Sequence, residues 1–266
     1  MRKSSGMPRF GEGRVRPDYW DALAGSMREP QFQEQIALYK RREGLALIAA
    51  WAPQQVRSVL KTDLFEEGFG QDALLDFFVS AYPVVIGMDV SRLVTAEARK
   101  RIPGAGYLVS DAATLPFKTG AFDLIVSIST LDHLPPPLLA GALADLCRVL
   151  RKDGCLILTL DSGHNPLHVF SNHLRRRLGR IYAERCYTVR EVQAAMVGQP
   201  WILTEATAIY HVPFPMNFLA KQVSKILGSR ADRPIRAVVG ACERLAALPT
   251  RFFTGRYIAL RLIKGE

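Results

Sequence analysis

The sequence feature that most constrains the fold is an alternation of strand-like and helix-like segments that begins at residue 56. Apolar runs of strand length are separated by segments whose apolar residues recur every three or four positions. In such a pattern each helix carries the chain back to the start of the next strand, so the strands run parallel and the crossovers are right-handed. We therefore predict an α/β fold with a doubly wound sheet, whose first five strands cover 56–63, 84–90, 106–112, 122–129 and 155–160.

Local signals indicate where some of the connecting elements begin and end. Ser91 is placed to cap the helix that follows the second strand. The pair Asp153-Gly154 is typical of a helix end, just before the fifth strand. Residues 64–70 are expected to form an open loop after the first strand.

Helical segments flank the alternation on both sides. A basic arm of about 15 residues leads into helices that end near residue 50 and are interrupted at Pro30. Near the other end, Thr188 and Glu191 have the spacing of a capping box. Two further strands are expected at 202–212 and 257–264, on either side of a helical insertion at 213–250. We therefore divide the chain into an N-terminal arm with helices, a core, and a final region that belongs to the same domain as the core, at 1–55, 56–163 and 164–266.

Composition favours a globular protein of the cell interior. Of the 266 residues, 48% are hydrophobic, but no apolar run approaches the ~20 residues of a membrane span. The basic residues near the start are not followed by the apolar stretch of a secretory signal, so we do not expect export. The four cysteines lie far apart without C-x-x-C spacing, which predicts reduced, structural thiols and a cytoplasmic location.

The net charge of +10 is unevenly distributed along the chain. Residues 56–163 contain 10 basic and 13 acidic side chains, whereas residues 164–266 contain 16 and 6. This asymmetry predicts an acidic core with a basic attachment that could meet a lipid headgroup, a phosphorylated substrate or nucleic acid. The alternative is a basic surface that serves only solubility.

Carboxylates stand at the ends of successive predicted strands. In an open α/β sheet, ligands bind beyond the carboxyl ends of the strands, where Asp63, Asp89 and Asp111 are found. We expect Asp89 to accept hydrogen bonds from both hydroxyls of a ribose, since Ser91 is better placed to cap the next helix. Asp111 could accept from an adenine amino group while the Ala112 amide donates to a ring nitrogen; alternatively, Asp111 is a solvated turn residue.

The first loop argues against a dinucleotide. A diphosphate needs close-set glycines at the start of a helix, whereas this loop presents the acids Asp63, Glu66 and Glu67. Their charge would repel phosphates but would attract the ammonium and sulfonium of S-adenosylmethionine. Gly68 and Gly70 still allow a close backbone approach. A nicotinamide-dependent oxidoreductase is therefore disfavoured.

Together these segments resemble the class I S-adenosylmethionine-dependent methyltransferases, in particular the small-molecule branch with a methyltransferase domain 11-like pattern. The matching segments are 84–91, 110–117, 122–134 and 146–160. The resemblance implies a Rossmann-like, seven-stranded, mainly parallel sheet that ends in an antiparallel C-terminal hairpin. It also implies S-adenosylmethionine as cofactor, with Val90, Ser129 and Thr130 joining the acids in its site.

One segment departs from the family pattern. The family's first loop reads Asp-x-Gly-x-Gly-x-Gly, whereas here the glycines are delayed until Gly68 and Gly70. Such a loop is compatible with an altered cofactor pose or with a chain that has lost catalysis. A non-catalytic module that binds an adenosyl ligand or a partner is therefore the alternative function.

Methyl transfer asks little of the side chains because the leaving group is already activated. His133, just after the fourth strand, is predicted to be a base or to orient the acceptor; alternatively, it packs against and caps the next helix. Asp132 would orient His133 or be solvated. No metal site is predicted, because no carboxylate or cysteine completes a ligand set with His164, His168 and His173.

Acceptor specificity in the family lies outside the core, here in basic and amphipathic segments. Lys221 and Lys225 share one helical row and Phe218, Val223 and Ile226 another, while Arg175-Arg176-Arg177 and Arg180 form a cluster. We predict a lid that admits a small-molecule, anionic or lipid-like acceptor, with peripheral contact at the inner membrane surface through 164–250. The alternative is a helical cover with its charges in water. A nucleic-acid methyltransferase ranks third, because the Asn/Asp-Pro-Pro-aromatic motif and an aromatic platform are missing.

Overall fold

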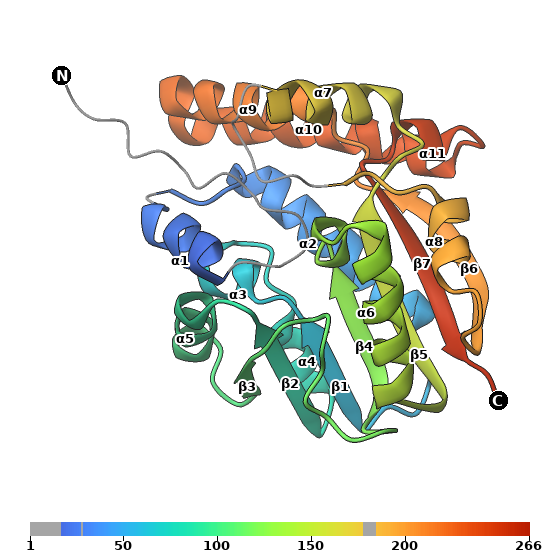
Figure 1. Cartoon of the computed structure of the whole chain (residues 1–266). Helices are drawn as coiled ribbons and strands as arrows, with labels where there is room; N and C mark the ends of the chain where they lie inside the picture. Colours follow the sequence, from blue (N-terminus) through green and yellow to red (C-terminus); the bar gives the residue numbers. More distant parts are fainter. Residues whose placement is uncertain (1–16, 28, 178–184) are drawn as a thin grey trace.

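The computed structural model describes residues 17–27, 29–177 and 185–266 and contains a sheet of seven strands in the order β3-β2-β1-β4-β5-β7-β6 (Figure 1). Neighbouring strands from β3 to β5 are parallel, and β7 is antiparallel to both β5 and β6. This confirms the predicted mainly parallel sheet with an antiparallel C-terminal hairpin. The strands are β1 Ser58–Thr62, β2 Val84–Asp89, β3 Gly106–Val109, β4 Phe122–Ile128, β5 Leu150–Asp161, β6 Trp201–Ile209 and β7 Tyr257–Lys264.

Helices cover both faces of the sheet and form a further layer beyond one of its edges (Figure 1). The helices up to α6 are α1 Pro17–Ser26, α2 Glu34–Trp51, α3 Phe65–Phe69, α4 Leu75–Ala81, α5 Arg92–Arg101 and α6 Pro136–Val149. Those after β5 are α7 Pro166–Arg177, α8 Val189–Ala195, α9 Phe214–Leu227, α10 Asp232–Glu243 and α11 Arg251–Thr254. Short 3-10 turns occupy Leu131–His133, Gly228–Ala231 and Arg244–Ala247.

The central strands are buried on both faces, as expected for a parallel sheet between two helical layers. All five residues of β1 are buried, and β5 is buried from Gly154 onward. On one face α6 packs through Leu139, Leu143 and Leu146. On the other face α2, α4 and α5 form a second apolar cluster. This double coverage holds the strand ends in a fixed arrangement.

The predicted helix caps are present. The Ser91 side chain accepts a hydrogen bond from the Val94 amide at the start of α5, and Thr188 and Glu191 form both bonds of a capping box before α8. Asp21 of α1 accepts hydrogen bonds from the Ser91 hydroxyl and from the Leu93 amide. These bonds fix α1 at the positively polarised N-terminus of α5.

Two local predictions are corrected. Part of the expected loop 64–70 is the short helix α3. The pair Asp153-Gly154 does not end α6, which stops at Val149, but lies within β5. There the Asp153 φ is +60°, a Cβ on Gly154 would lie 2.7 Å from Leu150 Cγ, and the pairing of β4 with β5 shifts register. The pair therefore shapes a bulge, which has the same left-handed backbone requirement as a helix end.

The carboxyl ends of the parallel strands meet at one edge of the sheet, below the layer formed by α7, α9 and α10 in Figure 1. The two helices expected before the sheet are α1 and α2, with their interruption around Pro30. The predicted basic arm and Arg180 lie outside the described residues. Among the described helices, none has the length and apolar character needed to cross a membrane.

Candidate functional site

A cavity of about 330 Å³ lies at the carboxyl edge of the sheet and contains most of the predicted site residues. Its wall on the side of α1 and α2 is aromatic and apolar, with Trp20, Met27 and Phe32. Arg175 and Arg256 contribute positive charge. The predicted residues that line it are Asp63, Glu66, Asp89, Val90, Asp111, Ala112, Ser129, Thr130, Asp132 and His133. Glu67, Gly68 and Gly70 do not line this cavity.

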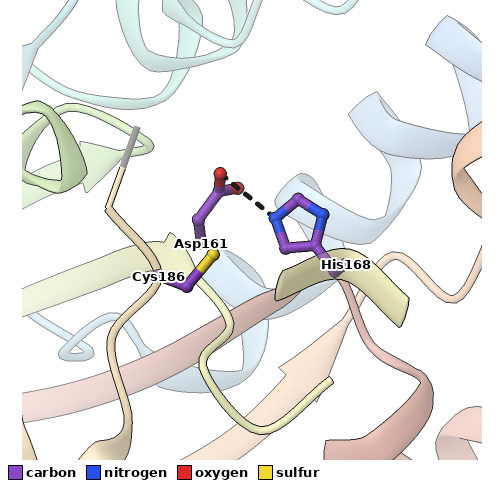
Figure 2. Close-up of side chains that lie close together, drawn as sticks. All are labelled: Asp161, His168 and Cys186. Carbon is purple, nitrogen blue, oxygen red and sulfur yellow. Dashed lines mark ion pairs between the residues drawn. The ribbon is translucent and has the colours of Figure 1, made fainter. Parts of the chain in front are cut away.

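A side-chain cluster that sequence analysis did not find lies at the end of β5 (Figure 2). His168 Nε2 is 3.1 Å from Asp161 Oδ2, and the Cys186 thiol completes a set whose ligand-type atoms lie within 4.8 Å of one another. The prediction that no carboxylate or cysteine would complete a ligand set with His168 is therefore wrong. Arg256 Nε also lies 3.9 Å from Asp161 Oδ1, so a guanidinium already supplies positive charge at this carboxylate. Of these residues, Asp161 and Arg256 line the cavity, whereas His168 and Cys186 lie behind Asp161 and do not line it.

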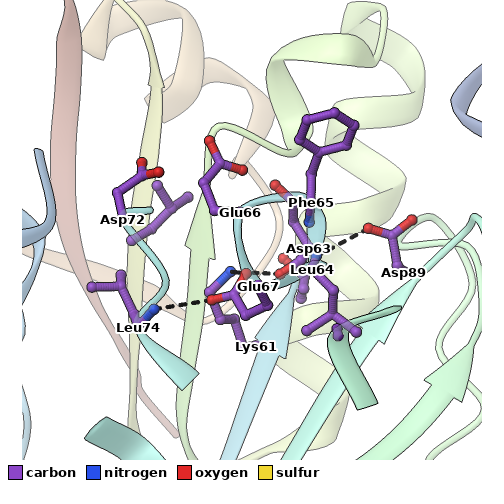
Figure 3. Close-up of polar contacts among 12 residues, drawn as sticks. Lys61, Asp63, Leu64, Phe65, Glu66, Glu67, Asp72, Leu74 and Asp89 are labelled. Carbon is purple, nitrogen blue, oxygen red and sulfur yellow. Dashed lines mark hydrogen bonds and ion pairs between the residues drawn. The ribbon is translucent and has the colours of Figure 1, made fainter. Parts of the chain in front are cut away.

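Glu67, Gly68 and Gly70, which were predicted to bind the cofactor but do not line the cavity, shape the packing around the first loop. Glu67 is fully buried, where its Oε2 lies 3.0 Å from Lys61 Nζ and its Oε1 accepts a hydrogen bond from the Leu74 amide (Figure 3). A Cβ on Gly68 would lie 3.2 Å from the Val94 carbonyl, so this glycine allows α3 to pack on α5. A Cβ on Gly70 would lie 2.8 Å from Glu66 Cα.

Two buried lysines balance the acidic first loop. Lys61 donates to the Asp63 carbonyl at 2.5 Å as well as to Glu67. Lys40 of α2 lies 2.7 Å from Glu66 and 2.8 Å from Asp72. Burial alone would lower the pKa of Lys40, but the nearby carboxylates hold it well above its usual value, so the side chain is charged. The repulsion of phosphates is therefore weaker than the sequence suggests, because these cations offset the loop's charge.

Asp89 is anchored and still partly open to the cavity. Its Oδ2 accepts a hydrogen bond from the Leu64 amide at 3.0 Å, and its Oδ1 accepts one from the Ser91 amide at 2.8 Å. Each oxygen has a second lone pair, but the Asp63 side chain also hydrogen-bonds to this carboxylate, so one of the two ligand donors would take the place of Asp63. Burial raises the pKa of Asp89; it also raises the pKa of Asp63, with the charges of Glu66 and Asp89 adding to that rise. A cationic ligand group would relieve this cost.

Asp111 forms the turn after β3. Its Oδ1 accepts a hydrogen bond from the Ala113 amide at 2.8 Å, and its carbonyl accepts one from the Thr114 amide at 3.1 Å. The turn interpretation therefore describes part of its role. The same turn holds Asp111 and Ala112 at the cavity wall, beside the end of β2.

Ser129 and Thr130 follow β4 in a constrained conformation. The Ser129 φ is +48°, a left-handed value that is rare outside glycine, and its amide donates to the Thr159 carbonyl at 3.0 Å. Thr130 donates its hydroxyl proton to the Thr62 carbonyl at 2.9 Å. Within the described residues, the Ser129 hydroxyl is buried and has no hydrogen-bond partner. Since this oxygen is shielded from solvent, it would have to turn toward the cavity to meet a ligand. The acceptors that line the cavity, on Asp63, Asp89 and Asp111, fit a nucleoside cofactor with polar ends.

His133 lies in the turn after β4 and is in contact with Trp20, a residue that sequence analysis did not assign to the site. The Trp20 ring of α1 packs edge-on against the imidazole, with ring centroids 4.8 Å apart. Burial lowers the pKa of His133 to about 4, although the charges of Asp161 and Glu66 offset part of this effect. At neutral pH the ring is therefore uncharged and can accept or donate one hydrogen bond.

Asp132 is not solvated, contrary to one of the two expectations. It is buried, its Oδ2 accepts a hydrogen bond from the Asp161 amide at 3.2 Å, and its carbonyl accepts one from the Arg185 amide at 2.8 Å. Asp132 therefore joins the turn after β4 to the end of β5. Asp161 stands at a strand end like the other acids, so the same rule applied to the fifth strand would have found it. Trp20 and Lys40 carry no comparable local signal.

Comparison with known protein families and curated sequences gives a consistent result. A family model described as a methyltransferase domain matches residues 65–158. The chain is 30% identical over 131 residues to the trans-aconitate 2-methyltransferase of Methylobacterium nodulans, a match that covers 48% of this chain and 47% of that protein. It is 29% identical over 166 residues to the malonyl-[acyl-carrier protein] O-methyltransferase of Geobacter sulfurreducens, covering 57% and 61%. The chain thus spans about half the length of these curated relatives.

Solved structures share the fold. A chain from the complex between the Haloferax volcanii Trm112 methyltransferase activator and a putative methyltransferase aligns with a TM-score of 0.61 at 15% identity. The alignment covers 95% of this chain and 100% of that one. At this level of identity, the likeness concerns the arrangement of strands and helices.

The buried ion pair below the first loop generates a stability prediction. Lys61→Met should lower the free energy of unfolding by about 3–5 kcal/mol, because Glu67 would remain buried without its cation. The double variant Lys61→Met/Glu67→Gln should recover much of that loss. Lys100→Met, which removes an exposed pair with Glu97, is the matched control and should change stability by less than about 1 kcal/mol. Urea denaturation measures all three; equal effects of Lys61→Met and Lys100→Met would contradict the role of the pair.

The lowered pKa of His133 generates a pH prediction. In the unfolded chain a histidine takes up a proton near pH 6.5, whereas the folded protein resists protonation until about pH 4. The stability that His133 contributes is therefore complete above pH 6.5 and is lost as the pH falls toward 4. Between pH 7 and pH 5, the wild type should lose roughly 2 kcal/mol more stability than His133→Gln. The exposed His173→Gln variant is the control, and a wild-type pH slope that matches that of His133→Gln would overturn the burial argument.

Proposed function

We propose that the chain is a class I S-adenosylmethionine-dependent methyltransferase and that it transfers a methyl group from this cofactor to a small-molecule acceptor, since a methyltransferase-domain model matches residues 65–158. The observation that carries the proposal is the meeting of Asp89 and Asp111, from the ends of two adjacent strands, in one cavity. The ribose and the adenine of a nucleoside present partners for these two carboxylates.

Each part of the proposed cofactor site has a chemical reason. Asp89 would accept from the two ribose hydroxyls with the lone pairs that Leu64 and Ser91 do not use, one of the hydroxyls replacing the Asp63 side chain. Asp111 and Ala112 would meet the adenine edge. Asp63 would face the ammonium group, whose charge would make the ionised form of this buried carboxyl less costly.

The chain's own contribution to methyl transfer is alignment and exclusion of water. S-adenosylmethionine supplies a methyl group already activated on a sulfonium. Trp20 packs on His133, and with the apolar wall around it would exclude water from this side of the cavity once cofactor and acceptor are bound. Because a base works best with a pKa near the working pH, the buried and neutral His133 is better suited to orient an acceptor by hydrogen bonding than to remove its proton.

We infer an anionic or lipid-like acceptor from the composition of the cavity. Arg175 and Arg256 supply positive charge, while Phe32 and Met27 supply apolar surface. Two of the curated relatives are named for trans-aconitate and for a malonyl group, both of which carry carboxylates. An acceptor with an acidic head and an apolar part would use both kinds of wall.

One observation favours the second candidate, a non-catalytic adenosyl-binding module. Residues 65–69 form the helix α3 where the family has a glycine-rich turn. Cofactor binding without formation of S-adenosylhomocysteine on any tested acceptor would favour this alternative.

The proposed site is tested by calorimetric titration of S-adenosylmethionine into the protein. Asp89→Asn should weaken binding at least tenfold, because one charge-assisted acceptor for the ribose is lost, an effect of about 1.5–3 kcal/mol. Glu97→Gln, a charge-removing change on the outer side of α5, is the control and should leave the affinity within twofold. Thermal denaturation checks that both variants fold. Unchanged affinity in Asp89→Asn, or no binding to the wild type, would reject the proposed site.

A further inference from the structure

The helices α7 and α9 expose large apolar side chains to solvent. On α7 the exposed residues Leu167, Phe170 and Leu174 recur at spacings of three and four, so they share one side of the helix. On α9 the residues Leu219, Val223 and Ile226 recur in the same way. Leu167, Phe170 and Ile226 are 76%, 67% and 80% exposed. We call these six residues the apolar face.

The apolar face is separate from the sides by which the two helices join the protein. On α7 the buried residues are His168 and Asn172. On α9 the buried residue is Ala220, which packs in a cluster with Ile36 and Ile235. Each helix therefore has its packing side and, in addition, an apolar side in water. A helix that served only as a solvated cover would carry polar residues there.

The charges carried by the two helices of the apolar face are of one sign, although Glu29, from the segment after α1, lies 3.4 Å from Lys225. The sequences of α7 and α9 contain no Asp or Glu, whereas Arg175, Arg177, Lys221 and Lys225 lie within them. The two helices also lie next to each other in the layer above the sheet (Figure 1). Exposed aliphatic and aromatic side chains flanked by basic residues are the composition of helices that bind in the plane of an anionic bilayer. This complementarity in charge selects a lipid surface over a neutral partner.

The apolar face adjoins the cavity. The Asn217 side chain of α9 accepts a hydrogen bond from the Gln33 amide at 2.9 Å and donates one to the Gln31 carbonyl at 3.1 Å. Lys221 donates to the Pro30 carbonyl at 2.6 Å. Gln31 and Phe32 line the cavity. Arg175 of α7 lines it as well, one residue after the exposed Leu174. The helices that bear the apolar face therefore also hold or form part of the cavity wall.

We propose that the apolar face docks on the surface of an anionic bilayer and that the acceptor is an amphiphile taken up from that surface. The uptake part rests on the proposed methyl transfer, whereas the docking part does not. Burial of the apolar face in the acyl boundary gives affinity, and the lysines and arginines of α7 and α9 give the preference for anionic headgroups. Docking brings the lipid surface next to the wall formed by Gln31, Phe32 and Arg175.

Vesicle cosedimentation of the full chain tests the docking. Vesicles of phosphatidylcholine alone are compared with vesicles that contain about one third phosphatidylglycerol. Wild type should bind the anionic vesicles at least tenfold more tightly than the neutral ones. Phe170→Ser/Ile226→Ser should weaken that binding at least tenfold. The control Val197→Ser/Ile202→Ser removes two other exposed apolar side chains, near α8 and on β6, and should change it less than twofold.

Three results would overturn the docking. These are no binding to either vesicle, equal binding to both, or equal losses in the two double variants. A fourth result, a concentration-dependent dimer that Phe170→Ser/Ile226→Ser dissociates, would overturn it by assigning the apolar face to a second copy of the chain. Calorimetric titration of S-adenosylmethionine without vesicles separates this test from the proposed function. Cofactor binding with no vesicle binding rejects the docking and the uptake from the surface but not the methyl transfer. Vesicle binding with no cofactor binding rejects the methyl transfer and the uptake that rests on it but not the docking.

Discussion

The buried pairing of Lys61 with Glu67 is the constraint on which the site depends. Lys61 comes from the central strand β1 and Glu67 from α3, and both side chains are almost completely excluded from water. Such a pair is costly to break, because either partner alone would be an uncompensated buried charge. It fixes α3 directly after β1, which places the Leu64 amide within hydrogen-bond distance of Asp89. The orientation of the carboxylate therefore follows from an ion pair outside the large cavity.

A second buried lysine, Lys40, neutralises part of the negative charge of the first loop. Lys40 reaches from α2 to Glu66 and Asp72, so these carboxylates are held by a helix that precedes the sheet. Asp63 and Asp89, which also line the cavity, have pKa values raised chiefly by burial. A site of this kind favours a ligand that brings positive charge and hydroxyl donors, which connects the electrostatics of the loop to the proposed cofactor.

The features that could be predicted from sequence are those set by local patterns. Alternating side chains gave the bounds of β7, and hydroxyl residues at the correct spacing gave the caps Ser91 and Thr188. That Asp89 and Asp111 share one cavity could be predicted, because the sheet topology was predictable and ligands bind at the carboxyl ends of parallel strands. The missed features depend on contacts between distant segments. Nothing near Trp20 indicates that it will cover His133, and the approach of Cys186 to His168 and Asp161 depends on the path of the chain after β5.

The central claim is that the carboxyl edge of the sheet binds an adenosyl sulfonium next to a neutral histidine. The hydrogen-bonded acids at the strand ends and the helix α1, which packs over His133, are already in place for this ligand. The most direct measurement is a crystal structure of the protein grown with S-adenosylmethionine. The account predicts ribose hydroxyls within hydrogen-bond distance of Asp89, adenine against the turn of Asp111 and Ala112, and the methyl group on the side of His133. A nucleoside bound elsewhere, or a cavity that stays empty at saturating cofactor, would contradict it.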